Sequence, residues 1–182
     1  MTLNVLFLCT HNSARSVLAE ATLTHIGQGR FKGFSAGSSP RANQQPNPLA
    51  LETLRKHGIA TDGLYSKSWD VFAPSDASQQ PLMDIIITVC DNAAGEVCPY
   101  WPGQPATAHW GYADPSFMPG SDDDRRRAFD ITWALIHQQL NQLVALPLEQ
   151  MNAKERFARL RAMAREPFPL PLPAAVADLG AP

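Results

Sequence analysis

The sequence predicts a parallel α/β fold, in which buried strands alternate with helices. Two short runs, Val5–Leu8 and Met83–Val89, are apolar at successive positions, as expected for strands buried on both faces of a parallel sheet. Segments with helical periodicity lie between and after these runs. Buried strands that alternate with helices are typical of a parallel sheet.

The helix between the two strands is defined by its ends. Asn47 followed by Pro48 is an N-cap and first-turn pair, and Gly58 ends the segment. Ala50, Leu51 and Leu54 then share one face of the helix. This segment therefore connects one strand to the next.

Two further helices follow in the C-terminal third of the chain. The longer one begins at three aspartates, 122–124, and stops before Pro147, with apolar residues at spacings of four and three: Phe129, Trp133, Ile136, Leu140 and Leu143. The next is capped by Asn152, with Glu155 three residues on, and ends before Pro167. Arginines 125–127 follow the three aspartates, so we expect a nearly neutral helix start with no function of its own.

The chain divides into three parts on this basis. We expect a catalytic domain over residues 1–147, a helical extension over 148–166 and a Pro-rich tail over 167–182, where five of the 16 prolines lie.

Composition narrows the possible partners and compartments. The 182 residues carry 15 Lys and Arg against 17 Asp and Glu, so no overall positive field favours nucleic acid or an anionic membrane. No early apolar run approaches the roughly 20 residues needed to span a bilayer, and no basic leader precedes it. Three cysteines are too few for a secreted disulfide framework. We expect a cytoplasmic monomer with working thiols.

The most informative segment is Cys9–Ser16, which follows the first strand directly. A Cys and an Arg separated by five residues, between a strand and a helix, let the backbone N–H groups of the loop point at one tetrahedral anion. The oxyanion-binding residues are then Thr10, His11, Asn12, Ser13, Ala14 and Arg15. The helix end favours a Cys9 thiolate, to which Ser16 donates its hydroxyl, while the Asn12 amide pins the loop.

This loop resembles that of the low-molecular-weight protein tyrosine phosphatase family. Later motifs resemble the thioredoxin-coupled arsenate reductase branch of that family: Thr88–Asp91, Cys98-Pro99, His109–Gly111 and Asp114-Pro115. The resemblance covers about residues 3–146 and implies a four-stranded parallel sheet flanked by helices. Position 14 is Ala14, where some members carry another cysteine.

The resemblance also implies a cysteine relay that reduces arsenate for arsenic detoxification. Cys9 is the nucleophile, Asp114 protonates the departing oxygen, and Cys90 and then Cys98 resolve the sulfur intermediates by forming disulfides. An external thiol reductant, thioredoxin or glutathione with glutaredoxin, restores the thiols. We expect no tightly bound cofactor and no metal.

Two alternative functions remain open from the residues alone. The chain could be a low-molecular-weight phosphatase acting on phosphotyrosine or small phosphate esters, although Ser116 stands where such phosphatases carry a tyrosine after Asp-Pro. It could also be a non-catalytic oxyanion-binding or redox-sensing module. A partial zinc site of Cys90, Cys98 and His109 has too few ligands to be closed.

Overall fold

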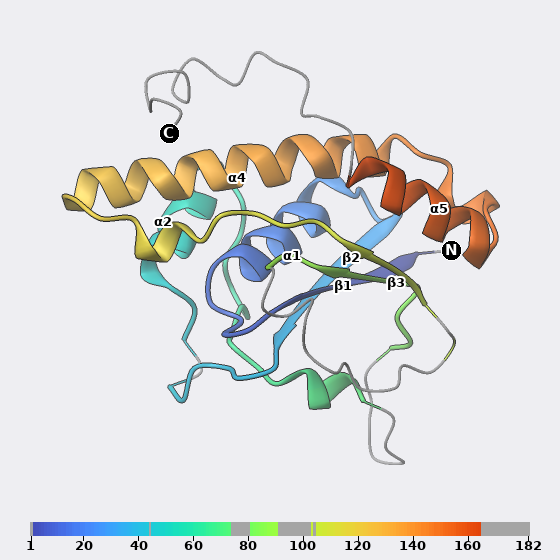
Figure 1. The fold of residues 1–182 in the computed structure, drawn as a ribbon, viewed down its shortest axis with the longest axis horizontal. Coiled ribbons are helices and arrows are strands. Elements are labelled where there is room, and N and C mark those ends of the chain that lie inside the picture. Colours follow the sequence, from blue (N-terminus) through green and yellow to red (C-terminus); the bar gives the residue numbers. More distant parts are fainter. Residues whose placement is uncertain (1, 44, 74–80, 91–102, 104, 165–182) are drawn as a thin grey trace.

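Four parallel strands form a single sheet in a computed structural model, which describes residues 2–43, 45–73, 81–90, 103 and 105–164. The strands are β1 (Leu3–Cys9), β2 (Phe31–Gly37), β3 (Ile85–Thr88) and β4 (Ala106–His109), and their order across the sheet is β2-β1-β3-β4 (Figure 1). The predicted four-stranded parallel sheet is confirmed. The two strands expected from their apolar runs are β1 and β3, its central pair.

The helices cover the sheet in layers. Helices α1 (Arg15–Ile26), α4 (Asp122–Val144) and α5 (Ala153–Met163) lie above the strands in Figure 1, α2 (Pro48–Lys56) lies beside α4, and the 3-10 helix Trp69–Phe72 lies below. Alternate side chains of β1 point to opposite faces of the sheet. Val5 and Phe7 pack into the main core under the helices, while Leu6 and Leu8 pack into a smaller core with Phe72.

The predicted helix ends are confirmed. The Asn47 side chain accepts a hydrogen bond from the Leu49 N–H (2.9 Å) at the start of α2, and Gly58 beyond its end has a φ of +72°, a conformation that favours glycine. At the start of α5, Asn152 and Glu155 exchange side-chain to backbone hydrogen bonds, as in a capping box.

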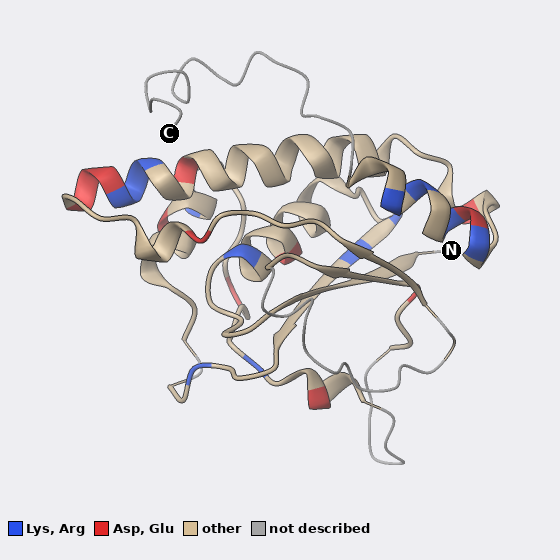
Figure 2. Ribbon diagram, in the orientation of Figure 1, with Lys and Arg blue, Asp and Glu red and all other residues tan. Residues whose placement is uncertain are grey.

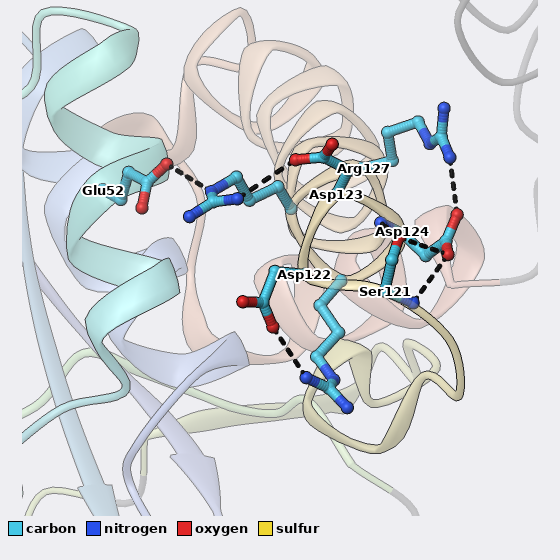
Figure 3. Close-up of polar contacts among 8 residues, drawn as sticks. Glu52, Ser121, Asp122, Asp123, Asp124 and Arg127 are labelled. Carbon is cyan, nitrogen blue, oxygen red and sulfur yellow. Dashed lines mark hydrogen bonds and ion pairs between the residues drawn. The ribbon is translucent and has the colours of Figure 1, made fainter.

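The charges at the start of α4 neutralise one another (Figures 2 and 3). Each aspartate pairs with the arginine three residues on, and the separations are 2.9 Å for Asp122, 3.1 Å for Asp123 and 2.5 Å for Asp124. Arg126 also reaches Glu52 of α2 at 3.0 Å. The near-neutral helix start expected from the sequence is confirmed, and exposed pairs of this kind contribute little to stability.

Helix α5 is packed on the β4 side of the sheet. Leu160 and Met163 are buried in the main core, and the Trp110 indole N–H donates to the Leu160 carbonyl at 3.1 Å. Helix α5 and the end of α4 therefore share one core with the rest of the fold. Residues 165–182, which include the expected Pro-rich tail, lie outside the described residues, and the division of the chain at residue 147 stays a prediction.

None of the helices in the described segments is both long enough and apolar enough to cross a membrane.

Replacing Leu160 with Ala tests how far α5 contributes to the fold. Because this side chain is fully buried, we expect Leu160→Ala to lower the free energy of unfolding by about 2–5 kcal/mol in urea titrations followed by circular dichroism. Lys154→Ala, an exposed change in the same helix, is the control and should shift it by less than about 0.5 kcal/mol. Equal effects of the two changes would contradict a shared core.

Candidate active site

Cys9 lies at the carboxyl end of β1, where the loop to α1 begins. Its side chain is buried, and Arg15 starts the helix six residues later. Asn12 adopts a left-handed backbone conformation with a φ of +46°. This conformation turns the loop, so that the Asn12 N–H points at the Cys9 sulfur at 3.2 Å.

A close approach from β2 holds the loop in place. Gly37, the last residue of β2, lies so near the loop that a Cβ at this position would come within 2.4 Å of the Thr10 carbonyl oxygen. The Ser39 N–H donates to the same carbonyl at 2.9 Å. A side chain at position 37 would therefore push the loop away from the sheet.

Two donors face the Cys9 sulfur. Ser16 Oγ lies 2.9 Å from Cys9 Sγ, the contact expected from the sequence, and the Asn12 N–H is the second donor. Burial raises the pKa of Cys9, and the nearby Cys90 raises it too, whereas the hydrogen bonds from Ser16 and Asn12 and the charge of Arg15 lower it. The net shift of the pKa is upward, because desolvation outweighs the donors. The loop groups act in the direction expected from the sequence, and burial opposes them.

The Asn12 side chain joins the loop to two other segments. Its Nδ2 donates to Ser16 Oγ at 2.9 Å and to Ser35 Oγ of β2 at 2.8 Å. Its Oδ1 accepts from the Lys67 N–H at 2.8 Å. The whole residue is buried, so each polar atom of its amide finds a protein partner.

A buried ion pair lies behind this amide. Ser35 donates to the Glu20 carboxylate, and the Lys67 ammonium lies 3.6 Å from the same carboxylate. Burial raises the pKa of Glu20 and lowers that of Lys67, while each partner's charge opposes that shift in the other. Lys67 has no recognisable motif around it, and the sequence did not indicate it. The positive charge that faces the buried Glu20 carboxylate is therefore the ammonium group of Lys67.

Arg15 is held by the segment that carries the candidate acid. One guanidinium nitrogen donates to the Tyr112 carbonyl at 2.8 Å and the other to Asp114 Oδ2 at 2.6 Å. Asp114 Oδ1 accepts from the Ser116 N–H at 2.9 Å, which starts a short 3-10 helix. Asp114 therefore both begins a turn and faces Arg15, so its turn-forming role and its position in the site occur together.

A pocket of about 430 Å³ opens over the Cys9 sulfur. Residues on its walls that the sequence had indicated as site residues are Cys9, His11, Ser13, Ala14, Arg15 and Asp114. Its other walls come from Arg41 and Asn47, which the sequence had not indicated as pocket residues, and from Ser116 and Phe117. Phe117 is 78% exposed at the rim.

The second cysteine lies beside the loop. Strands β1 and β3 pair with Leu8 opposite Thr88, so the chain reaches Cys90 just beyond the end of β3. The Cys90 sulfur is buried and lies 3.7 Å from the Thr10 hydroxyl. Thr10 thus links the nucleophile's loop to a second thiol.

Cys98 lies outside the described residues, and with it the disulfide to Cys90 and the zinc alternative. The third residue of that alternative, His109, has its Nδ1 2.8 Å from Thr88 Oγ1. In the part of the chain that the structure describes, no group of three or more His, Cys, Asp or Glu side chains is placed to hold a metal ion.

The arrangement suits displacement at a tetrahedral oxyanion. Cys9, Arg15 and Asp114 line one pocket, and the Asn12 N–H points at the Cys9 sulfur. A second thiol beside the loop adds the means for thiol–disulfide exchange.

Comparisons with known proteins agree with this geometry. The chain is 30% identical over 128 residues to an arsenate reductase of Halalkalibacterium halodurans, an alignment that covers 69% of this chain and 83% of that protein. A crystal structure of an arsenate reductase from Archaeoglobus fulgidus is 25% identical and superimposes with a TM-score of 0.57, covering 78% of this chain and 99% of the other. A thioredoxin-dependent arsenate reductase of Corynebacterium glutamicum is 28% identical, with a TM-score of 0.55 and coverage of 82% and 64%.

A family model for the low molecular weight phosphotyrosine protein phosphatases matches residues 4–156. This match includes the Cys9–Ser16 loop, the segment around Asp114 and, apart from Leu3 at the start of β1, all four strands. The chain belongs to the low molecular weight phosphotyrosine protein phosphatase family.

Proposed function

We propose that this protein reduces arsenate to arsenite through a relay of three cysteines. The observation that carries the proposal is the placement of Cys90 against Thr10, within the loop that surrounds Cys9. Hydrolysis of a phosphate ester needs only the first of these thiols, whereas reduction needs two electrons, which a pair of thiols can supply. The similarity to arsenate reductases supports the same choice.

The first step is attack by the Cys9 thiolate on arsenic. The backbone of Thr10–Arg15 and the Arg15 guanidinium hold the oxyanion, and Asp114 donates a proton to the departing hydroxide, which leaves as water. A sulfur–arsenic bond forms as the arsenic–oxygen bond breaks. This role of Asp114 is supported by its 2.6 Å contact with Arg15, since both residues line the pocket.

The second step transfers the electrons. The Cys90 thiolate attacks the Cys9 sulfur, the sulfur–arsenic bond breaks with its electron pair remaining on arsenic, and arsenite leaves as a Cys9–Cys90 disulfide forms. Cys98 then attacks the Cys90 sulfur, which releases the Cys9 thiolate and forms a Cys90–Cys98 disulfide. An external dithiol of the thioredoxin type, or glutathione with glutaredoxin, supplies the two electrons that reopen it.

This chemistry favours a reducing compartment. Thiols that must cycle between the reduced state and a disulfide need a supply of reductant, so we place the protein in the cytoplasm. The same relay requires neither a resident cofactor nor a metal ion, and we propose that the protein works as a monomer.

The relay can be tested by single-turnover reaction of the fully reduced full-length protein with arsenate. We expect one arsenite to appear as two thiols disappear, with peptide mapping showing a Cys90–Cys98 disulfide. Cys98→Ser should yield one arsenite, form the Cys9–Cys90 disulfide and then stall even with thioredoxin. Multiple turnovers by Cys98→Ser with thioredoxin would contradict the proposed relay.

The same assay separates reduction from phosphate-ester hydrolysis. Cys90→Ser should stop at the Cys9–arsenic adduct and release no arsenite, while any hydrolysis of an aryl phosphate should persist, because that reaction needs only Cys9. If the unaltered protein hydrolyses the aryl phosphate and forms no arsenite, the phosphatase function replaces the proposed one.

Asp114→Asn tests the acid. Loss of the proton donor should slow arsenite formation in a single turnover by about 10²–10⁴-fold, because proton transfer by a positioned group contributes this much. Phosphate binding should change far less, since the Arg15 guanidinium remains. Asp62→Asn, an exposed change elsewhere, serves as the control, and unchanged turnover in Asp114→Asn would exclude the assigned role.

Ser16→Ala tests the activation of the thiol. Burial already raises the pKa of Cys9, so the rate of its alkylation by iodoacetamide should rise with pH as the thiolate forms. Removing the Ser16 hydroxyl removes a donor that lowers this pKa, so the alkylation profile should move to higher pH. The exposed change Ser39→Ala should leave the profile in place. A shift to lower pH would contradict this role of Ser16.

A further inference from the structure

Arg41 lies in the wall of the pocket, yet the chemistry above gives it no role. It comes from the connection between β2 and α2 and shares the pocket with Arg15, His11 and Asp114. The described part of the chain gives its guanidinium neither an ion pair nor a hydrogen-bond acceptor, and only its backbone N–H is bonded. An exposed arginine without a carboxylate partner therefore faces the place where an oxyanion is expected.

The backbone around Arg41 is fixed to the catalytic loop. The Arg41 N–H donates to Ser66 Oγ at 3.1 Å, and the Ser66 hydroxyl donates to the His11 carbonyl at 2.8 Å. On the far side of the connection, the Asn47 N–H donates to the Ser13 carbonyl at 2.8 Å. These bonds hold the Cα of Arg41 at a set position beside the loop, so its presence at the pocket follows from the fold.

The balance of charge shows what this arginine adds. Arg15 is paired with Asp114 at 2.6 Å, so the charges of these two groups largely cancel. Among the described residues that line the pocket, Arg41 is the remaining permanent cation. Arsenate and phosphate carry one or two negative charges at neutral pH, and a second arginine compensates charge that the first, already paired, leaves uncompensated.

The size of the pocket leaves room for this contact. A single tetrahedral oxyanion fills only part of the volume of about 430 Å³. An anion bound over Cys9 therefore presents its outward oxygens to the open part of the pocket. Arg41 lines the same pocket, so its guanidinium is within the space that these outward oxygens face.

We infer that Arg41 is a second anion-binding residue, which contacts the outward oxygens of the oxyanion held by the Cys9–Ser16 loop. The identity of that anion as arsenate rests on the proposed function, whereas the contact itself requires only a tetrahedral oxyanion. The arginine strengthens capture of the anion and takes no part in bond breaking. Its removal should therefore raise KM and leave the single-turnover rate at saturation unchanged.

Inorganic phosphate provides a test that does not depend on arsenate reduction. Phosphate in the loop should protect Cys9 of the full-length protein from iodoacetamide, and the concentration dependence of protection gives its Kd. We expect Arg41→Ala to raise this Kd about tenfold, equivalent to about 1.4 kcal/mol. Arg41→Lys, which keeps the charge, should recover most of the affinity. The rate of Cys9 alkylation without phosphate should stay the same in all variants.

Arg55→Ala is the matched control, because it removes the same charge from an exposed position on α2 that does not line the pocket. A phosphate Kd within twofold of the unaltered protein in Arg41→Ala, or an equal rise in Arg55→Ala, would overturn the inference. A changed rate of Cys9 alkylation without phosphate would also overturn it, since Arg41 would then act through the shape of the loop.

The arsenate reaction distinguishes this inference from the proposed function. A tenfold rise in phosphate Kd with no arsenite from the unaltered protein would support the role of Arg41 and refute arsenate reduction. If arsenite forms but phosphate and arsenate bind equally well without Arg41, the proposed function stands and the second anion-binding residue does not.

Discussion

The side-chain amide of Asn12 is the interaction on which the rest of the site depends. Its Nδ2 binds two hydroxyls and its Oδ1 accepts a backbone N–H, so one buried residue joins the catalytic loop to β2 and to the segment around Lys67. The left-handed backbone of the same residue turns its own N–H toward the Cys9 sulfur. A strained conformation of this kind persists because the surrounding hydrogen bonds compensate for it.

Electrostatic terms of opposite sign meet at the Cys9 sulfur. Burial protects the thiol from water but favours its neutral form, and the donors from Ser16 and Asn12 act against this effect. Arg15 adds a positive charge, which its ion pair with Asp114 largely neutralises. In the proposed reaction the oxyanion competes with Asp114 for the Arg15 guanidinium, so one ion pair joins the proposed anion-binding group to the proposed acid.

The topology of the sheet explains why two thiols meet. Parallel strands end at the same edge of a sheet, and β3 pairs directly with β1. Cys9 ends β1 and Cys90 follows β3, so residues 81 positions apart in the sequence lie near the same loop, with Thr10 between them. In this arrangement the second thiol needs no dedicated scaffold, because the central strand pair that forms the core also places the sulfurs.

The sequence by itself determined the features that short contiguous segments encode. The segment Cys9–Ser16 carries the nucleophile, the arginine and the hydroxyl within one loop. Apolar runs identify β1 and β3. Asn47 and Asn152 mark the starts of two helices, because each caps its helix by a local hydrogen bond. Strand β2 escaped prediction because its glycines, Gly33 and Gly37, interrupt an apolar pattern, and the reason for them is the close approach of other backbone.

Only the tertiary structure decided which distant groups reach the site. The Glu20–Lys67 pair, the Tyr112 carbonyl and Arg41 come from separate segments, and no local spacing connects any of them to Cys9. The net pKa shift of Cys9 belongs with them, since it depends on how completely the fold removes water from the sulfur. The pKa of Cys9 and the contacts of these residues depend on the packing of remote segments. A sequence motif therefore identifies the reacting atom but not the surroundings that set its charge.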